Sequence, residues 1–226
     1  MKKVLFVDTI HPYLWEELQK EGYSCIEGYD LSENAIIEQH NDIYGLVIRS
    51  RISVNANYLS HFNKLTFIAR AGSGMENIDV KYAHSKNIRA INAAEGNKQA
   101  VAEHALGMIL SLFNNLNKAD SEVRKSIWQR EENRGIELNG KTIGIIGYGN
   151  NGSALAKILS GFDTKVLAYD KYKTNYTPKY AIESDMQTIF EQTDILSLHI
   201  PITEETNGLV NDEFLKQFHK PIYLIN

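Results

Sequence analysis

Short apolar runs alternate with amphipathic segments along the first ninety residues of the chain. The pattern predicts strands at 4–7, 24–26, 46–49, 65–69 and 88–92, separated by helices at 12–20, 33–40, 55–62 and 78–86. Because parallel strands need crossover connections, this alternation favours a parallel sheet covered by helices. We therefore expect residues 1–98 to form one α/β domain.

A strongly apolar segment at about 100–113 follows this first block. Its apolar positions recur at helical spacing and cover more than one face of the expected helix, so more than one face must be buried. An interdomain position and a subunit interface both satisfy this requirement, and we expect an interdomain helix and a homodimer. Polar residues dominate 114–139, where Ile127 and Trp128 are the expected anchors.

The most informative motif lies after residue 140. An apolar strand at 141–146 leads into the run Gly147-Tyr148-Gly149-Asn150-Asn151-Gly152, and a helical segment and a second strand at 165–169 follow. Three glycines alone are a weak signal, because such triplets occur by chance in turns. A strand before them and a helix after them are the context that indicates a dinucleotide-binding Rossmann unit.

Each glycine of this motif has a physical role in that interpretation. Gly147 permits the tight turn from strand to helix, and Gly149 lets the backbone approach a diphosphate with no Cβ in the way. Gly152 lets the helix pack closely on the strand. The N–H groups of the first helical turn then face the phosphates, where the helix dipole favours negative charge.

Asp170 ends the second strand of the motif, where a carboxylate accepts hydrogen bonds from the adenosine ribose. The same carboxylate would repel a 2′-phosphate, so the sequence predicts NAD as the cofactor rather than NADP. Lys171 and Lys173 follow directly and weaken that preference.

Composition and charge fit a soluble enzyme of one large or two modest domains. The 226 residues carry a net charge of −4 and are 43% hydrophobic, which argues against nucleic acid or acidic membranes as partners. Cys25 is the single cysteine, and the seven histidines lack carboxylates at ligand spacing, so we expect no metal site. No apolar run has the length of a membrane span. The apolar run at the start of the chain is too short for a signal peptide. We expect a cytoplasmic protein.

Two loops of the first domain follow strands, at the edge where open α/β sheets bind ligands. Arg49-Ser50-Arg51 offers planar donors suited to a carboxylate or a phosphate, although a pair of solvated arginines is the alternative. The segment 70–79 contains Gly72-Ser73-Gly74, whose successive N–H groups form either an anion-binding nest or a plain turn.

Taken together, the segments 48–51, 70–79, 101–104, 147–152 and 198–201 resemble the D-isomer-specific 2-hydroxyacid dehydrogenases, in the same order and over essentially the whole chain. The resemblance implies two doubly wound parallel sheets: a flavodoxin-like substrate domain at 1–98 and a Rossmann NAD-binding domain at 99–226. It also implies an NAD-dependent oxidoreductase that interconverts a D-2-hydroxy acid and its 2-keto acid.

The resemblance also assigns site residues. The substrate would be bound by Arg49, Ser50, Arg51, Gly72, Ser73 and Gly74, with Ser73 near the nicotinamide. The cofactor would be bound by the run 147–152, through the backbone of Asn150 and Asn151 at the diphosphate, and by Asp170, His199, Ile200, Pro201 and Thr206. His199 is expected to line the cofactor rather than act as the general acid.

The family's three catalytic residues, an arginine, a carboxylate and a histidine, would follow Asn226, so no catalytic residue is expected within the chain. The segment 221–226 reads as a buried strand with no element after it, and a native terminus normally lies at the surface. We expect both domains to be incomplete at their C-terminal ends, and the fragment alone to be inactive.

Several functions stay open at this stage. The two arginines suit a phosphorylated acid, so 3-phosphoglycerate is the first candidate substrate, followed by glycerate/hydroxypyruvate and 4-phosphoerythronate. An NAD-binding regulatory protein without catalysis is the alternative of another class. A short-chain dehydrogenase with a Tyr-x-x-x-Lys pair is disfavoured, because matches such as Tyr82/Lys86 and Tyr169/Lys173 arise by chance among 12 tyrosines.

Overall fold

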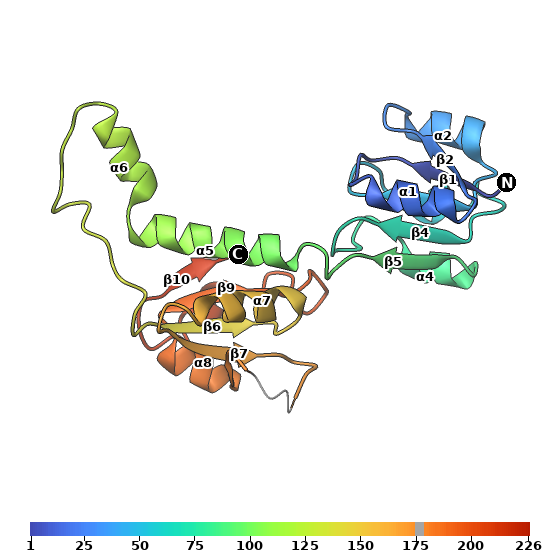
Figure 1. Ribbon diagram of the computed structural model, residues 1–226. Coiled ribbons are helices and arrows are strands. Elements are labelled where there is room, and N and C mark those ends of the chain that lie inside the picture. Colours follow the sequence, from blue (N-terminus) through green and yellow to red (C-terminus); the bar gives the residue numbers. More distant parts are fainter. Residues whose placement is uncertain (175–178) are drawn as a thin grey trace. The chain divides into compact units, whose positions relative to one another are not determined.

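The computed structural model describes residues 1–174 and 179–226. The chain divides into two compact units, Met1–Asn97 and Lys98–Asn226 (Figure 1). Each unit has a parallel five-stranded sheet at its centre.

The sheet of the first unit contains β1 (Lys3–Phe6), β2 (Ser24–Glu27), β3 (Gly45–Ile48), β4 (Phe67–Arg70) and β5 (Arg89–Asn92). The strands are parallel and stand in the order β2-β1-β3-β4-β5, which is the order of flavodoxin-like folds. The predicted fold class is therefore confirmed for this unit, and the strand ends differ from the predicted ones by one or two residues.

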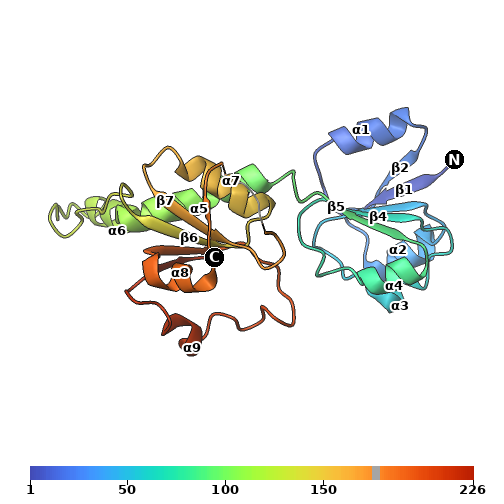
Figure 2. The same ribbon diagram turned by 90° about the horizontal axis from the view of Figure 1, so that it is seen from below.

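The helices of the first unit cover both faces of its sheet. One face packs against α1 (Tyr13–Lys20), and the other against α2 (Glu33–His40), α3 (Ala56–Leu59) and α4 (Val80–Ser85) (Figure 2). Successive residues of a strand point to opposite faces. In β1, accordingly, Val4 and Phe6 pack with the α1 side, and Leu5 packs with the α2 side.

The sheet of the second unit contains β6 (Thr142–Ile146), β7 (Lys165–Tyr169), β8 (Ile182–Glu183), β9 (Ile195–Leu198) and β10 (Tyr223–Ile225). Its order is β10-β9-β6-β7-β8, so the direction of winding reverses between β6 and β9. On one face lie α5 (Lys98–Phe113) and α7 (Asn150–Leu159), and on the other α8 (Met186–Gln192) and α9 (Asp212–Leu215) (Figure 2). This is the predicted Rossmann arrangement.

Between α5 and β6, one helix was not predicted and one prediction is wrong. The polar stretch after α5 contains a helix, α6 (Leu116–Val123), which the sequence did not indicate, and α6 buries none of its residues. Trp128 and Ile127 do not anchor the loop after it, because they are 81% and 43% exposed. The helix and this loop extend away from the sheet, so they have no core to pack against (Figure 1).

The sequence predicted a buried strand at the end of the chain. This prediction is wrong, because two of the three residues of β10 are exposed. The strand pairs with β9 alone in the described part of the chain and is an edge strand, so Tyr223 and Leu224 remain 38% and 41% exposed. Only Ile225 of this strand enters the core.

Candidate dinucleotide and anion sites

A cavity of about 760 Å³ lies in the second unit, at the carboxyl ends of its strands. Its lining includes the glycine turn after β6, the loop after β7, the loop after β9, and side chains of α8 and α9. Because β6 and β9 are neighbours at the point where the winding reverses, this is the place at which open α/β sheets bind ligands. Of the predicted cofactor residues, the lining includes Gly147, Gly149, Asp170, His199, Ile200, Pro201 and Thr206.

Gly147 makes a turn that no other residue type would fit. Its φ is +94°, in the left-handed region that disfavours a Cβ. A Cβ built there would stand 2.5 Å from the backbone oxygen of His199. The Gly147 amide donates to the carbonyl of Tyr169 at 2.8 Å, so the turn is held between β7 and the loop after β9.

The other two glycines of the motif differ from each other in what surrounds them. A Cβ on Gly152 would overlap the carbonyl oxygen of Gly147, so α7 lies against the turn more closely than any side chain permits. A Cβ on Gly149 would meet no atom of the described residues within 4 Å. Gly149 also begins α7 without a side-chain cap, which leaves the first amides of the helix for another acceptor. These residues fit a diphosphate.

The side chains of the remaining residues of the glycine run do not line the cavity. Tyr148 is buried with its ring in the core, and burial raises the pKa of its hydroxyl. Asn150 and Asn151 form the first turn of α7, and their side chains do not line the cavity.

Asp170 is held in place by three backbone amides. Its Oδ2 accepts from Tyr148 at 2.8 Å, and its Oδ1 accepts from Tyr172 at 3.0 Å and from Lys173 at 3.1 Å. A carboxylate has about four acceptor positions. Oδ2, with one hydrogen bond, therefore retains capacity for a hydroxyl group.

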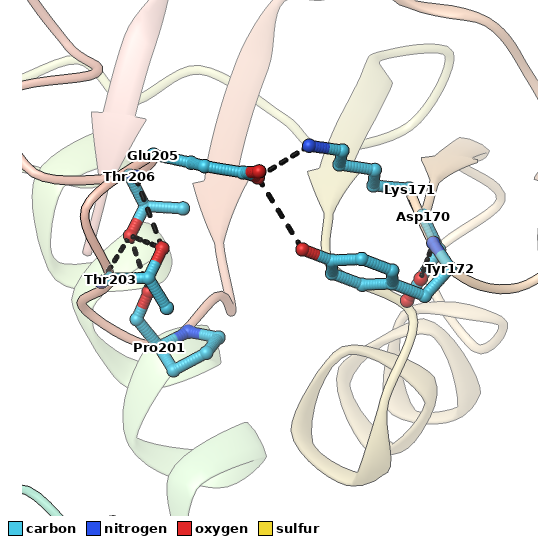
Figure 3. Close-up of polar contacts among 7 residues, drawn as sticks. All are labelled: Asp170, Lys171, Tyr172, Pro201, Thr203, Glu205 and Thr206. Atoms are coloured by element: carbon cyan, nitrogen blue, oxygen red, sulfur yellow. Dashed lines mark hydrogen bonds and ion pairs between the residues drawn. The ribbon is translucent and has the colours of Figure 1, made fainter.

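The two lysines beside Asp170 both have partners. Lys173 Nζ donates to the carbonyl of Tyr148 at 3.1 Å. Lys171 Nζ forms an ion pair with Glu205, which also accepts from the Tyr172 hydroxyl at 3.4 Å (Figure 3). The Glu205 carboxylate raises the pKa of Lys171, and Lys171 lowers the pKa of Glu205.

Hydrogen bonds within the loop after β9 connect its own residues. Thr206 Oγ1 donates to the carbonyl of Pro201 at 2.6 Å and accepts from the amide of Thr203 at 2.8 Å (Figure 3). His199 Nε2 lies 3.0 Å from the hydroxyl of Ser197, and burial lowers the pKa of the imidazole. His199 is therefore neutral at pH 7, which suits a residue beside a cofactor.

In the first unit, the Arg51 guanidinium donates to three backbone carbonyls. Nε and Nη2 donate to the carbonyl of Val7 at 3.1 and 2.8 Å, Nη2 donates to Gly28 at 2.9 Å, and Nη1 donates to Leu31 at 2.8 Å. The guanidinium joins the segments that follow β1 and β2. Because these carbonyls accept four hydrogen bonds and a guanidinium has five N–H groups, the assignment of Arg51 to the substrate stays a prediction.

Arg49 and Ser50 are exposed, as Arg51 is, but the Arg49 side chain makes no hydrogen bond or ion pair within residues 1–174 and 179–226. The backbone of Arg49 is fixed from both sides. Its amide donates to Asp8 Oδ2 at 2.5 Å, and its carbonyl accepts from Asn77 Nδ2 at 3.2 Å. The loop after β3 thus fixes the backbone of Arg49 by two hydrogen bonds and leaves its guanidinium without a partner in the described residues.

The loop after β4 offers fewer amides than its three-residue run suggested. The Gly72 amide donates to the carbonyl of Arg70 at 2.9 Å, so it is not available to a ligand. Ser73 is fixed by Asn97, which accepts from its hydroxyl at 2.6 Å, and by Asn92, which donates to its carbonyl at 2.6 Å. The amides of Ser73 and Gly74 make no hydrogen bond within residues 1–174 and 179–226.

Residues 106–226 match the family model for the NAD binding domain of D-isomer specific 2-hydroxyacid dehydrogenases, over more than half of the chain. The chain belongs to this family. Its Rossmann unit is the family's NAD binding domain, and the glycine turn and cavity fit that cofactor.

Curated relatives and solved structures agree with the family. The chain is 31% identical to D-3-phosphoglycerate dehydrogenase of Homo sapiens over 228 residues, which are all of this chain and 43% of that enzyme. It is 36% identical to hydroxypyruvate reductase of Thermotoga maritima over 183 residues, 80% of this chain and 59% of that protein. The chain thus spans less than half the length of the human relative.

Among solved structures, D-lactate dehydrogenase of Aquifex aeolicus in complex with NAD and lactic acid superimposes with a TM-score of 0.81 at 26% identity. The apo-structure of D-lactate dehydrogenase from Escherichia coli gives a TM-score of 0.77, also at 26% identity. Both matches cover 99% of this chain, and 68% and 72% of those chains.

Neither a metal-ligand cluster nor a membrane-spanning helix occurs in the described residues. Within residues 1–174 and 179–226, no three of the His, Cys, Asp and Glu side chains are grouped so that they could hold a metal ion. In the same part of this family member, none of the helices has the length and apolarity needed to cross a bilayer.

Sequence reasoning missed several residues that form hydrogen bonds or ion pairs within the loops of the two candidate sites. Asp8, Asn77, Asn92 and Asn97 fix the loops after β3 and β4. Glu205 reaches Lys171 and Tyr172 across the dinucleotide cavity. No local pattern marks these contacts, because each joins residues far apart in the sequence.

We expect the Arg51→Ala variant to lower the free energy of unfolding of the first unit by about 1–3 kcal/mol, because charge-assisted hydrogen bonds to three carbonyls are lost. The matched variant Arg49→Ala should change it by less than about 0.5 kcal/mol, since that exposed side chain makes no hydrogen bond within residues 1–174 and 179–226. Scanning calorimetry measures both variants. Equal effects would contradict the different roles of the two arginines.

A pH effect is expected from His199. Its pKa in the folded protein lies below the unfolded value of about 6.5, so the folded state favours the neutral ring. This contribution is complete above the unfolded pKa, and it is lost as the pH falls below it toward the folded pKa. The His199→Gln variant should therefore lose less stability than the wild type between pH 7.5 and pH 5.5 in calorimetry. The exposed His84, replaced by Gln, is the control that keeps the wild-type pH dependence.

Proposed function

We propose that this chain is part of an NAD-dependent oxidoreductase that interconverts a D-2-hydroxy acid and its 2-keto acid, with D-3-phosphoglycerate as the substrate. The observation that carries the proposal is the dinucleotide cavity at the point where the Rossmann sheet reverses its winding, in a member of this dehydrogenase family. The identity to D-3-phosphoglycerate dehydrogenase over the whole chain supports this choice of substrate.

The residues of the second unit have distinct tasks in this proposal. The first amides of α7 hold the diphosphate, and Asp170 accepts hydrogen bonds from the adenosine ribose. Neutral His199, with Ile200 and Pro201, lines the cavity and donates no proton to the substrate. The bound NAD supplies the hydride acceptor.

The first unit supplies the substrate site in this proposal. The exposed Arg49 guanidinium, with the Ser50 hydroxyl beside it, binds an anionic group of the acid. The amides of Ser73 and Gly74 offer a second anion site, with the serine hydroxyl next to them. Two anionic contacts suit a substrate with a carboxylate and a phosphate. The residues that exchange the hydroxyl proton are placed outside these 226 residues, so the chain alone should bind NAD without turnover.

Steady-state kinetics of the full-length protein, with NAD and each candidate acid, test which acid is the substrate. We expect the highest kcat/KM for D-3-phosphoglycerate, ahead of glycerate and 4-phosphoerythronate. Glycerate is the second candidate, because the Thermotoga maritima relative is a hydroxypyruvate reductase. The Arg49→Ala variant should raise KM for the phosphorylated acids with kcat little changed. Absence of turnover with every one of these acids would refute the dehydrogenase.

An NAD-binding regulatory protein without catalysis is the second candidate function. The observation behind it is that the dinucleotide cavity is formed by residues of this chain. It predicts that the full-length protein binds NADH, with measurable affinity, and turns over none of these acids.

We also propose that the protein forms a homodimer in the cytoplasm. The end of α5, α6 and the loop after them expose a row of large apolar side chains: Leu112, Leu116, Val123, Ile127 and Trp128. An exposed apolar surface of this kind marks a protein interface. Sedimentation velocity of the full-length protein should give a dimer, and Trp128→Lys should shift it toward the monomer. A monomeric wild type would refute the dimer.

A further inference from the structure

One carboxylate joins two loops across the dinucleotide cavity. Glu205, from the loop after β9, forms an ion pair with Lys171 and accepts a hydrogen bond from the Tyr172 hydroxyl, both from the loop after β7 (Figure 3). All three residues line the cavity. The side chains of Lys171 and Glu205 are 55% and 58% exposed, so the pair lies at the mouth and remains open to ligands.

The position of Lys171 in the sequence connects this ion pair with the choice between NAD and NADP. It follows Asp170 directly, at the strand end where a carboxylate accepts hydrogen bonds from the ribose of NAD. A cation at that place is what a 2′-phosphate requires, so Lys171 by itself would favour NADP. Lys173, the other lysine of the loop, is held by the carbonyl of Tyr148.

We propose that Glu205 is a second determinant of the preference for NAD over NADP, acting as a positioning residue through Lys171. The carboxylate holds the ammonium group toward the loop after β9 and neutralises it. With Glu205 present, the two carboxylates of Asp170 and Glu205 and the one ammonium of Lys171 sum to a single negative charge. With glutamine at position 205 the sum is zero, and Lys171 is released. The inference rests on NAD binding in this cavity and adds a specificity residue outside the glycine motif.

The test is the ratio of the affinities for NADPH and NADH, measured by fluorescence titration of the full-length protein without substrate. In Glu205→Gln we expect this ratio to rise by about 5- to 10-fold, the size of one charge-assisted contact to phosphate. The rise should shrink when the salt concentration is raised, since the site is exposed. An unchanged ratio would overturn the inference.

Two controls separate the role of Lys171 from a general change of charge. Glu204→Gln removes the same charge from the neighbouring residue, which is exposed and does not line the cavity, so the ratio should stay at the wild-type value. The double variant Lys171→Gln/Glu205→Gln should return the ratio to near the wild-type value. A double variant that keeps the higher ratio would show that Glu205 does not act through Lys171, and would overturn the inference. A wild type that binds neither coenzyme would instead refute the proposed function.

Discussion

Replacing Gly149 with alanine should weaken NADH binding by about 10- to 100-fold while the protein stays folded. The backbone at Gly149, with φ −83° and ψ −153°, is extended and has the negative φ that residues other than glycine adopt. The new Cβ would meet no atom of the described residues within 4 Å, so the fold has no reason to change. The space that it enters is the one through which a diphosphate approaches the first amides of α7.

Fluorescence titration with NADH and scanning calorimetry measure the two halves of this prediction. Gly161→Ala is the matched control, because Gly161 follows α7 on an exposed turn where a Cβ is accommodated, 3.8 Å from the carbonyl of Ile158. It should alter neither the affinity nor the melting temperature. Full NADH affinity in Gly149→Ala would mean that no diphosphate lies at the start of α7.

The glycine turn could be predicted from the sequence because its requirements are local. A strand, a left-handed turn and a helix follow one another within a few residues, so the roles of Gly147 and Gly152 depend on the chain's immediate neighbours. The alternating pattern of the first unit was predictable for a similar reason. The central strands β1 and β3 are buried on both faces, and their apolar runs are continuous.

The loops after β3 and β4 could be located from the sequence, but not the partners of their individual side chains. Arg49 and Arg51 are the same residue type two positions apart, and nothing in their spacing distinguishes them. The structure separates them because Val7, Gly28 and Leu31, from distant segments, bring their carbonyls to Arg51 alone. Such contacts depend on how the strands are ordered in space.

The same limit explains the errors between α5 and β6. The segment 114–139 is polar in composition, and tryptophan in a polar stretch normally marks an anchor in the core. Here α6 extends away from the sheet and buries none of its own residues, and Trp128 in the loop after it stays exposed (Figure 1). Composition indicates what a residue would gain by burial, but it does not indicate whether a core lies within reach.

The Gly152→Ala variant should lose stability where Gly149→Ala does not, although the two glycines are three residues apart. A Cβ at Gly152 overlaps the backbone oxygen of Gly147, and a backbone atom has no rotamer with which to move aside. Overpacking of this kind costs about 3 kcal/mol, whereas the helix gains only about 1 kcal/mol from alanine, so we expect a net loss of about 2 kcal/mol. Calorimetry should show a lower melting temperature for the second unit. NADH affinity should fall as well, because α7 can relieve the overlap only by moving away from the turn that holds its first amides. A variant as stable as the wild type would contradict the close packing of α7 on β6 and the role given to the third glycine.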